Sequence, residues 1–63
     1  MNKFIEIADG EEIYLINVNQ IVCVMPIPSA SGCTIVLTNY MYGKNVLNLD
    51  TVDYYAVKQL ISE

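Results

Sequence analysis

The stretch Lys44-Asn45-Val46-Leu47-Asn48-Leu49-Asp50-Thr51 decides the fold, because the hydrophobic period changes there from two to about 3.6. Before Asp50 the chain reads as short β-strands, and residues 44–49 are predicted to be the last of them. After it, apolar residues recur at helical spacing up to about Ser62. The side-chain oxygen of Asp50 or Thr51 can accept an amide of the first turn, so either is the expected N-cap. The C-terminal segment is therefore predicted to be a helix that follows a strand.

Turn residues divide the preceding sequence into short strands. The Asp9-Gly10 pair is typical of a type I′ hairpin turn, whose two central residues both have φ > 0. Pro26 and Pro28 end the third strand, because neither can donate to a β-ladder. Residues 39–43 are expected to form a hairpin tip. The predicted strands are residues 4–8, 12–17, 21–27, 33–38 and 44–49.

These elements predict an α+β fold: about five short antiparallel strands as a curled sheet or SH3-like partial barrel, then one C-terminal helix. Residues 1–63 form a single domain, since a chain of 63 residues has room for one core only. Strands 12–17 and 21–27 are apolar at consecutive positions, which indicates burial on both faces. One helix covers one face of a sheet, so the other face either curls into a barrel or meets another subunit.

The hydrophobic content predicts a homo-oligomer, with a dimer favoured. Hydrophobic residues make up 54% of the chain, more than a monomer this short can hide from water. The helix adds to this, because its apolar arc is wider than a surface helix needs. Tyr40 and Tyr42 either cap the local core, take part in self-association or contact a protein partner. The dimer is expected to use either the outer flank of the helix or the exposed face of the sheet. The interface candidates are Tyr54, Val57 and Ile61 on that flank, and Tyr40, Met41 and Tyr42 at the rim.

The charge balance argues against nucleic acid and membranes as direct partners. Three lysines face seven acidic residues, and there is no arginine or histidine. Nucleic-acid binders neutralise phosphates with clustered Lys and Arg, and an anionic membrane repels a chain of net charge −4. The chain has neither a signal-peptide pattern nor a membrane-spanning apolar run. A cytoplasmic location with Cys23 and Cys33 reduced is therefore expected.

Few residues offer enzymatic chemistry. No histidine can exchange protons near neutral pH, and Cys23 and Cys33 lie in apolar strands, where a thiol is a small hydrophobe. Neither the two cysteines nor the acidic residues near Asp9 have the pattern of a zinc or calcium site. We expect no catalytic residue, metal or cofactor. The prediction is a non-enzymatic interaction or assembly module of unknown role; the alternatives are a regulator associated with nucleic acid through a partner protein, and an enzyme.

Five short strand, turn and cap patterns follow one another along nearly the whole chain. They are Asp9-Gly10, Asn17-Val18-Asn19-Gln20-Ile21, Thr34-Ile35-Val36-Leu37-Thr38-Asn39, residues 44–49, and Asp50-Thr51-Val52-Asp53. This order resembles the FlbD-type family of small bacterial proteins, although residues 25–32 and 40–42 depart from it. The resemblance implies an association with flagellar genes and brings no catalytic residues. The strand-strand-helix half of LytTR DNA-binding domains is similar in shape, but its DNA-reading basic residues have no counterparts here.

Overall fold

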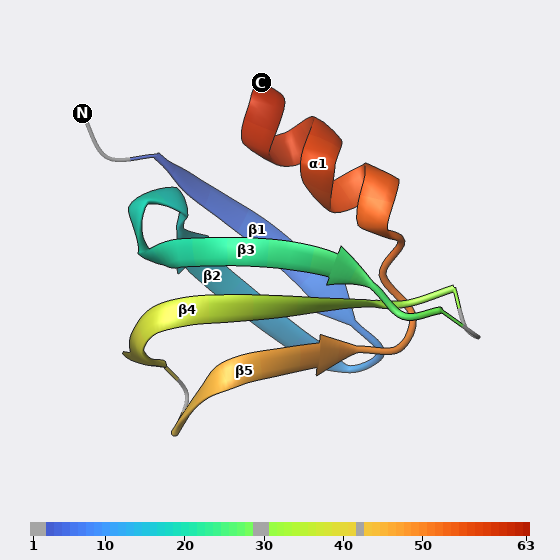
Figure 1. Ribbon diagram of the computed structural model, residues 1–63, viewed down its shortest axis with the longest axis horizontal. Coiled ribbons are helices and arrows are strands. Elements are labelled where there is room, and N and C mark those ends of the chain that lie inside the picture. Colours follow the sequence, from blue (N-terminus) through green and yellow to red (C-terminus); the bar gives the residue numbers. More distant parts are fainter. Residues whose placement is uncertain (1–2, 29–30, 42) are drawn as a thin grey trace.

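Two antiparallel β-sheets and a C-terminal helix make up the structure, a computed structural model that describes residues 3–28, 31–41 and 43–63. The elements are β1 (Phe4–Asp9), β2 (Glu12–Asn17), the 3₁₀ helix η1 (Val18–Gln20), β3 (Ile21–Pro26), β4 (Cys33–Met41), β5 (Lys44–Leu49) and α1 (Tyr54–Ser62). Strands β1 and β2 form one sheet, and β3, β4 and β5 form the other in that order (Figure 1). The α+β prediction is confirmed, and the sheets do not close into a barrel.

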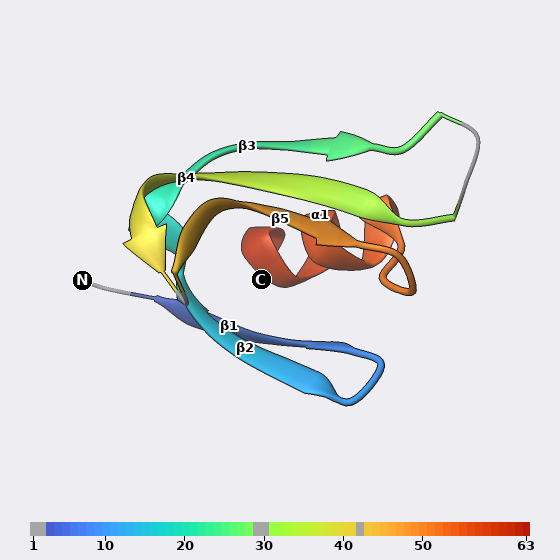
Figure 2. The same ribbon diagram turned by 90° about the horizontal axis from the view of Figure 1, so that it is seen from below.

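The two sheets lie as layers with α1 between them (Figure 2). Alternate residues of the strands point inward, so Ile5 faces Ile16 across the first sheet and Ile35 faces Leu47 across the second. Burying each large aliphatic side chain contributes about 1.5–3 kcal/mol. The core consists of Ile5, Ile7, Tyr14, Ile16, Cys33, Ile35, Leu37, Leu47, Leu49 and Val57. The helix therefore joins the two layers through its inward flank.

The first hairpin is confirmed, but the predicted central residues of its turn were wrong by one position. Asp9 pairs with Glu12, so the turn consists of Gly10 and Glu11. Gly10 has φ +64°, a left-handed conformation that costs glycine little. Asp9 is instead the last residue of β1, where its side chain makes a contact outside the turn.

That contact explains why the N-cap prediction was wrong. The Asp9 Oδ1 atom accepts from the Thr51 amide at 3.0 Å and from the Thr51 hydroxyl at 2.6 Å. Thr51 is thereby held at the end of the first hairpin, and the helix starts later. Asp53 is the N-cap, because its Oδ2 accepts from the Tyr55 amide at 3.1 Å. The predicted end of the helix, at Ser62, is confirmed.

Strand β4 is longer than predicted. It continues through Asn39 and Tyr40 to Met41, which pairs with Lys44. The expected tip over residues 39–43 was therefore wrong, because the chain turns only after Met41. Gly43 has φ +80°, which suits a residue in this tight turn. Tyr42 lies outside the described residues.

No helix in the described parts of the chain has the length and apolar character needed to cross a bilayer.

Lys3 contacts the last turn of α1, since its Nζ donates to the Ile61 carbonyl at 3.0 Å. A cation at this end of a helix is favourable because the last carbonyls carry partial negative charge. The start of β1 is thus tied to the C-terminal helix.

Candidate interaction surfaces

The outer side of the three-stranded sheet has an uncharged centre, and Lys44 lies at its edge, two residues before Val46 on β5. Cys23 pairs with Val36 and Val36 pairs with Val46, so these three side chains form a row opposite to the buried ones. A second row contains Met25, Thr34 and Asn48. These residues are termed the sheet face: Cys23, Met25, Thr34, Val36, Val46 and Asn48. Val46 is 40% exposed and Met25 is 46% exposed, so apolar groups reach the solvent here.

The polar groups of the sheet face bond within the chain. The Thr34 hydroxyl donates to Asn48 Oδ1 at 2.9 Å, which joins the two polar side chains of the face to each other. At the end of the same sheet, Gln20 Oε1 accepts from Thr38 Oγ1 at 2.6 Å and from Asn39 Nδ2 at 2.7 Å. Internal bonding of this kind lowers the cost of covering the face, because fewer polar groups lose their partners.

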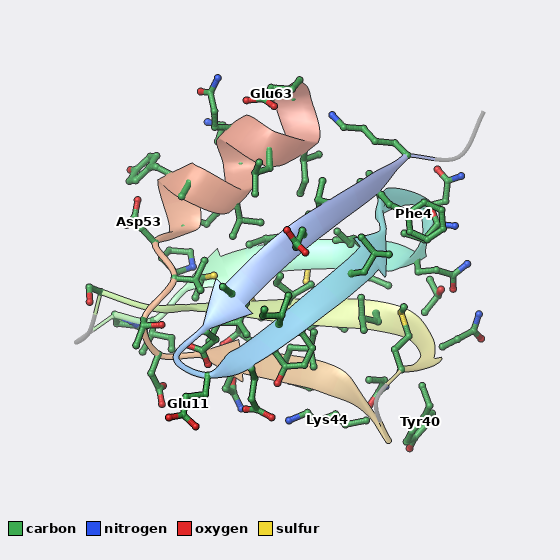
Figure 3. The ribbon with its side chains drawn as sticks, turned by 180° about the vertical axis from the view of Figure 1, so that it is seen from behind. Phe4, Glu11, Tyr40, Lys44, Asp53 and Glu63 are labelled. Carbon is green, nitrogen blue, oxygen red and sulfur yellow. The ribbon has the colours of Figure 1, made fainter. Side chains whose placement is uncertain are left out.

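The outer side of the first hairpin is the second apolar surface, and it contains a carboxylate. Leu15 lies opposite Glu6, and Ile13 lies opposite Ala8. These residues and Phe4 are termed the hairpin face: Phe4, Glu6, Ala8, Ile13 and Leu15. Ile13 is 63% exposed, and Phe4 and Leu15 are each 53% exposed. Figure 3 views this face from outside, with Phe4 at one end and Glu11 at the turn at the other.

The distribution of charge along the sequence separates the two faces. No residue between Glu12 and Lys44 is charged, and this run supplies β3 and β4 entirely. The hairpin, in contrast, carries Glu6, Asp9, Glu11 and Glu12. The six residues of the sheet face are therefore uncharged, with Lys44 at the edge of the face, whereas the hairpin face is apolar and acidic.

The prediction that β2 and β3 are buried on both faces was wrong within the single chain. Tyr14 and Ile16 of β2 face the core, but Ile13 and Leu15 face the solvent. Met25 of β3 and Val22, at the β-bulge, are exposed as well. The reason is the position of α1, which lies between the layers and covers neither outer side (Figure 2).

The predicted interface residues lie in different environments. Val57 is fully buried, so its expected place on an outer helix flank is corrected: it belongs to the core. Tyr54, Ile61 and Met41 are partly buried against that core. Tyr40 is the most exposed of the five candidates that the structure describes, at 75%, and lies near Lys44 at the end of β4–β5 (Figure 3).

Sequence reasoning named an exposed sheet face as a possible interface but not the residues of either face, and it missed one aromatic residue. Tyr55 is 70% exposed, and its ring contacts the Tyr54 ring edge-to-face with centroids 5.1 Å apart. The charge-free run could have indicated the sheet face, since it spans two whole strands. Alternation within β2 could have indicated that Ile13 and Leu15 share an outer side.

The two thiols differ in their surroundings. Cys33 lies in the core, where burial raises the pKa of its thiol; the nearby carboxylates of Asp53 and Asp9 raise it further. Cys23 lies on the sheet face and is partly exposed. Both are free cysteines, so Cys23 provides a chemical probe of that face.

Among residues 3–28, 31–41 and 43–63, no group of three potential metal ligands comes together and no pocket is found. The candidate sites of the described chain are therefore surfaces. Comparison with known proteins found no matching family model, no significantly similar curated protein and no significantly similar solved structure.

Proposed function

We propose that this chain is a non-enzymatic interaction module that forms a homodimer through its sheet face. The observation that carries the proposal is an uncharged, partly apolar face on a chain of net charge −4. A complex is stabilised by about 25 cal/mol for each Å² of exposed apolar surface that the partner removes from water. Closed two-fold dimers are the commonest assemblies that cover such a surface.

Electrostatics favour the sheet face over the rest of the surface. Two copies of an acidic chain repel each other. At physiological salt this repulsion acts over about 8–10 Å and is screened beyond that distance. A two-fold contact at the centre of the sheet face brings Val36 and Val46 toward their counterparts, and neither residue is charged. Contact through the hairpin face would bring Glu6 toward the acidic hairpin of the second copy.

The size of the sheet face limits the strength of the dimer. Three strands about 4.8 Å apart, with residues spaced by about 3.3 Å, give a face of roughly 15 by 20 Å. Two copies meeting there would bury on the order of 600–1,000 Å² in total, the size of a weak or transient interface. We expect a dissociation constant on the order of 10–100 μM.

A bacterial cytoplasm is the proposed setting. The resemblance to the FlbD-type family supports a bacterial origin and an association with flagellar genes. The two free thiols, Cys23 and Cys33, suit a reducing compartment. These proposals depend on the family and on the compartment, whereas the dimer depends on the sheet face alone.

Val46→Glu tests the dimer, and Ile13→Glu is the matched control. Both add one negative charge at an exposed apolar position on an outer β-face. Val46→Glu should remove the concentration-dependent mass increase in multi-angle light scattering, and Ile13→Glu should retain it. A wild-type chain that stays at 7.1 kDa up to about 1 mM would contradict the proposal.

A further inference from the structure

The hairpin face contains a carboxylate, which is unfavourable in a surface that binds a second copy of the same chain. Glu6 lies on β1 between Phe4 and Ala8 and directly opposite Leu15, so a carboxylate stands among apolar side chains. Like charges brought together in an interface are unfavourable, and a carboxylate covered without a partner loses its hydration. The hairpin face therefore selects against a second copy of this chain.

The charges around the hairpin face specify the chemistry of its partner. Glu11 lies at the turn, at the Ile13 end of the face, and is exposed. Glu12 begins β2 on the side of Tyr14, because side chains alternate along a strand. Lys3, the nearest cation in the sequence, donates to the Ile61 carbonyl at 3.0 Å and is thus held at the helix end. A partner with its own cations would supply the opposite charge to Glu6 and Glu11 while covering Phe4, Ile13 and Leu15.

We infer that the hairpin face binds a basic amphipathic helix, with apolar residues on one side and Lys or Arg along its flanks. The dimensions agree with this partner. Two strands present a surface about 10 Å wide and about 20 Å long, and a helix is about 10 Å across with a rise of 1.5 Å per residue. A helix of about 14 residues therefore spans the face. Its lysine stems would pack on the apolar side chains while their ammonium groups reach the carboxylates.

The inference goes beyond the proposed dimer, because the two faces belong to different sheets on opposite sides of the molecule (Figure 2). A dimer joined at the sheet face would leave both hairpin faces open. Such a dimer would present two equivalent sites for the basic helix, and the linkage would raise its avidity for a partner that carries two copies of the segment.

An NMR titration tests the inference with a synthetic 14-residue helix of leucine and lysine. Its counterpart, with every lysine replaced by glutamate, keeps the apolar side and reverses the charge of the flanks. The lysine peptide should shift amides of residues 4–8 and 13–17, and the glutamate peptide should not. Glu6→Gln should weaken binding about threefold, as expected for an exposed charge pair. Glu63→Gln, which removes the same charge at the exposed helix end (Figure 3), should leave binding unchanged.

Three results would overturn the inference. Equal losses in Glu6→Gln and Glu63→Gln would mean that net charge alone attracts the peptide. Amide shifts confined to β3–β5 would place the contact on the other sheet. Shifts of residues 4–8 and 13–17 with phosphatidylcholine vesicles, in the absence of an effect of the lysine peptide, would assign the face to a lipid surface.

Discussion

The sheet face and the hairpin face are both apolar, but only the hairpin face contains a charge. Val36 and Val46 have uncharged neighbours across the strands, whereas Leu15 lies opposite Glu6. Hydrophobicity favours covering both surfaces and does not choose what covers them. The carboxylates make that choice, because a second copy brings the same charge and a basic partner brings the opposite one. In this small protein, charge placement assigns different partners to two similar surfaces.

The largest expected effect comes from Gly32→Ala, which would break the sheet that carries the sheet face. Gly32 is buried, and a Cβ there would overlap the Leu49 carbonyl oxygen and lie 2.9 Å from the Asp50 Cα. Backbone atoms cannot move aside as a flexible side chain can, so we expect a loss of about 3 kcal/mol or more of unfolding free energy. Urea denaturation followed by circular dichroism measures this loss.

Gly43→Asn is the control for that substitution. A Cβ at Gly43 meets nothing within 4 Å, and asparagine tolerates a left-handed φ better than most residues. Its cost should stay below about 1 kcal/mol. An unchanged urea midpoint for Gly32→Ala would contradict the close approach between Gly32 and the end of β5.

Glu6→Leu should remove the difference between the two faces. With that carboxylate gone, the hairpin face becomes apolar as well, and chains can associate through both outer sides. Light scattering should then report masses above that of a dimer at about 100 μM and higher. Glu63→Leu makes the same replacement at the exposed end of α1 and should keep the wild-type mass. If both variants behave alike, Glu6 has no special part in keeping the hairpin faces apart.

Asp9 joins the hairpin to the segment after β5, so acid should weaken the connection between the two layers. Hydrogen bonds from the Thr51 side chain and amide hold the pKa of Asp9 below its ordinary value of 3.8. A lowered folded-state pKa stabilises the protein above pH 3.8, and this stabilisation is lost as the pH falls through the lower folded value. The melting temperature of the wild type should fall more steeply below pH 3.8 than that of Asp9→Asn. Parallel curves would mean that the Thr51 bonds do not stabilise the fold.

The smallest effect is chemical and leaves the fold intact. Iodoacetamide should modify Cys23 in the native protein and Cys33 only after denaturation, because burial both shields Cys33 and raises the pKa of its thiol. The rate at Cys23 should fall as the protein concentration enters the dimer range, and Val46→Glu should abolish this fall. Mass spectrometry measures both rates. Modification of Cys33 at a similar native rate would contradict its place in the core.

The sequence predicted the strands and the helix but not the surfaces. Alternation of Cys33, Ile35 and Leu37 with Thr34 and Val36 identifies β4 correctly, because period two follows directly from strand geometry. The N-cap was misplaced because Asp50, Thr51 and Asp53 are all suitable locally. A contact from Asp9, 42 residues away from Thr51, decides among them. Long-range contacts of this kind leave no local signal.

The candidate sites were harder to predict than the fold. Val57 has the same helical period as Tyr54 and Ile61, yet only the packed structure shows that Val57 is the residue fully enclosed. Consecutive apolar residues in β2 indicated two covered faces, whereas Ile13 and Leu15 remain outside. The expected tip over residues 39–43 failed for a similar reason, since pairing between Met41 and Lys44 extends β4.

An isotope-filtered NOE experiment tests the central claim most directly. Labelled and unlabelled chains would be mixed at a concentration well above the dissociation constant, so that only contacts between copies are detected. The proposed dimer predicts intermolecular NOEs from the methyl groups of Val36, Val46 and Met25, and none from Ile13 or Leu15. Intermolecular NOEs from Ile13 and Leu15 without any from Val36 or Val46 would contradict the claim, as would the absence of intermolecular NOEs at about 1 mM.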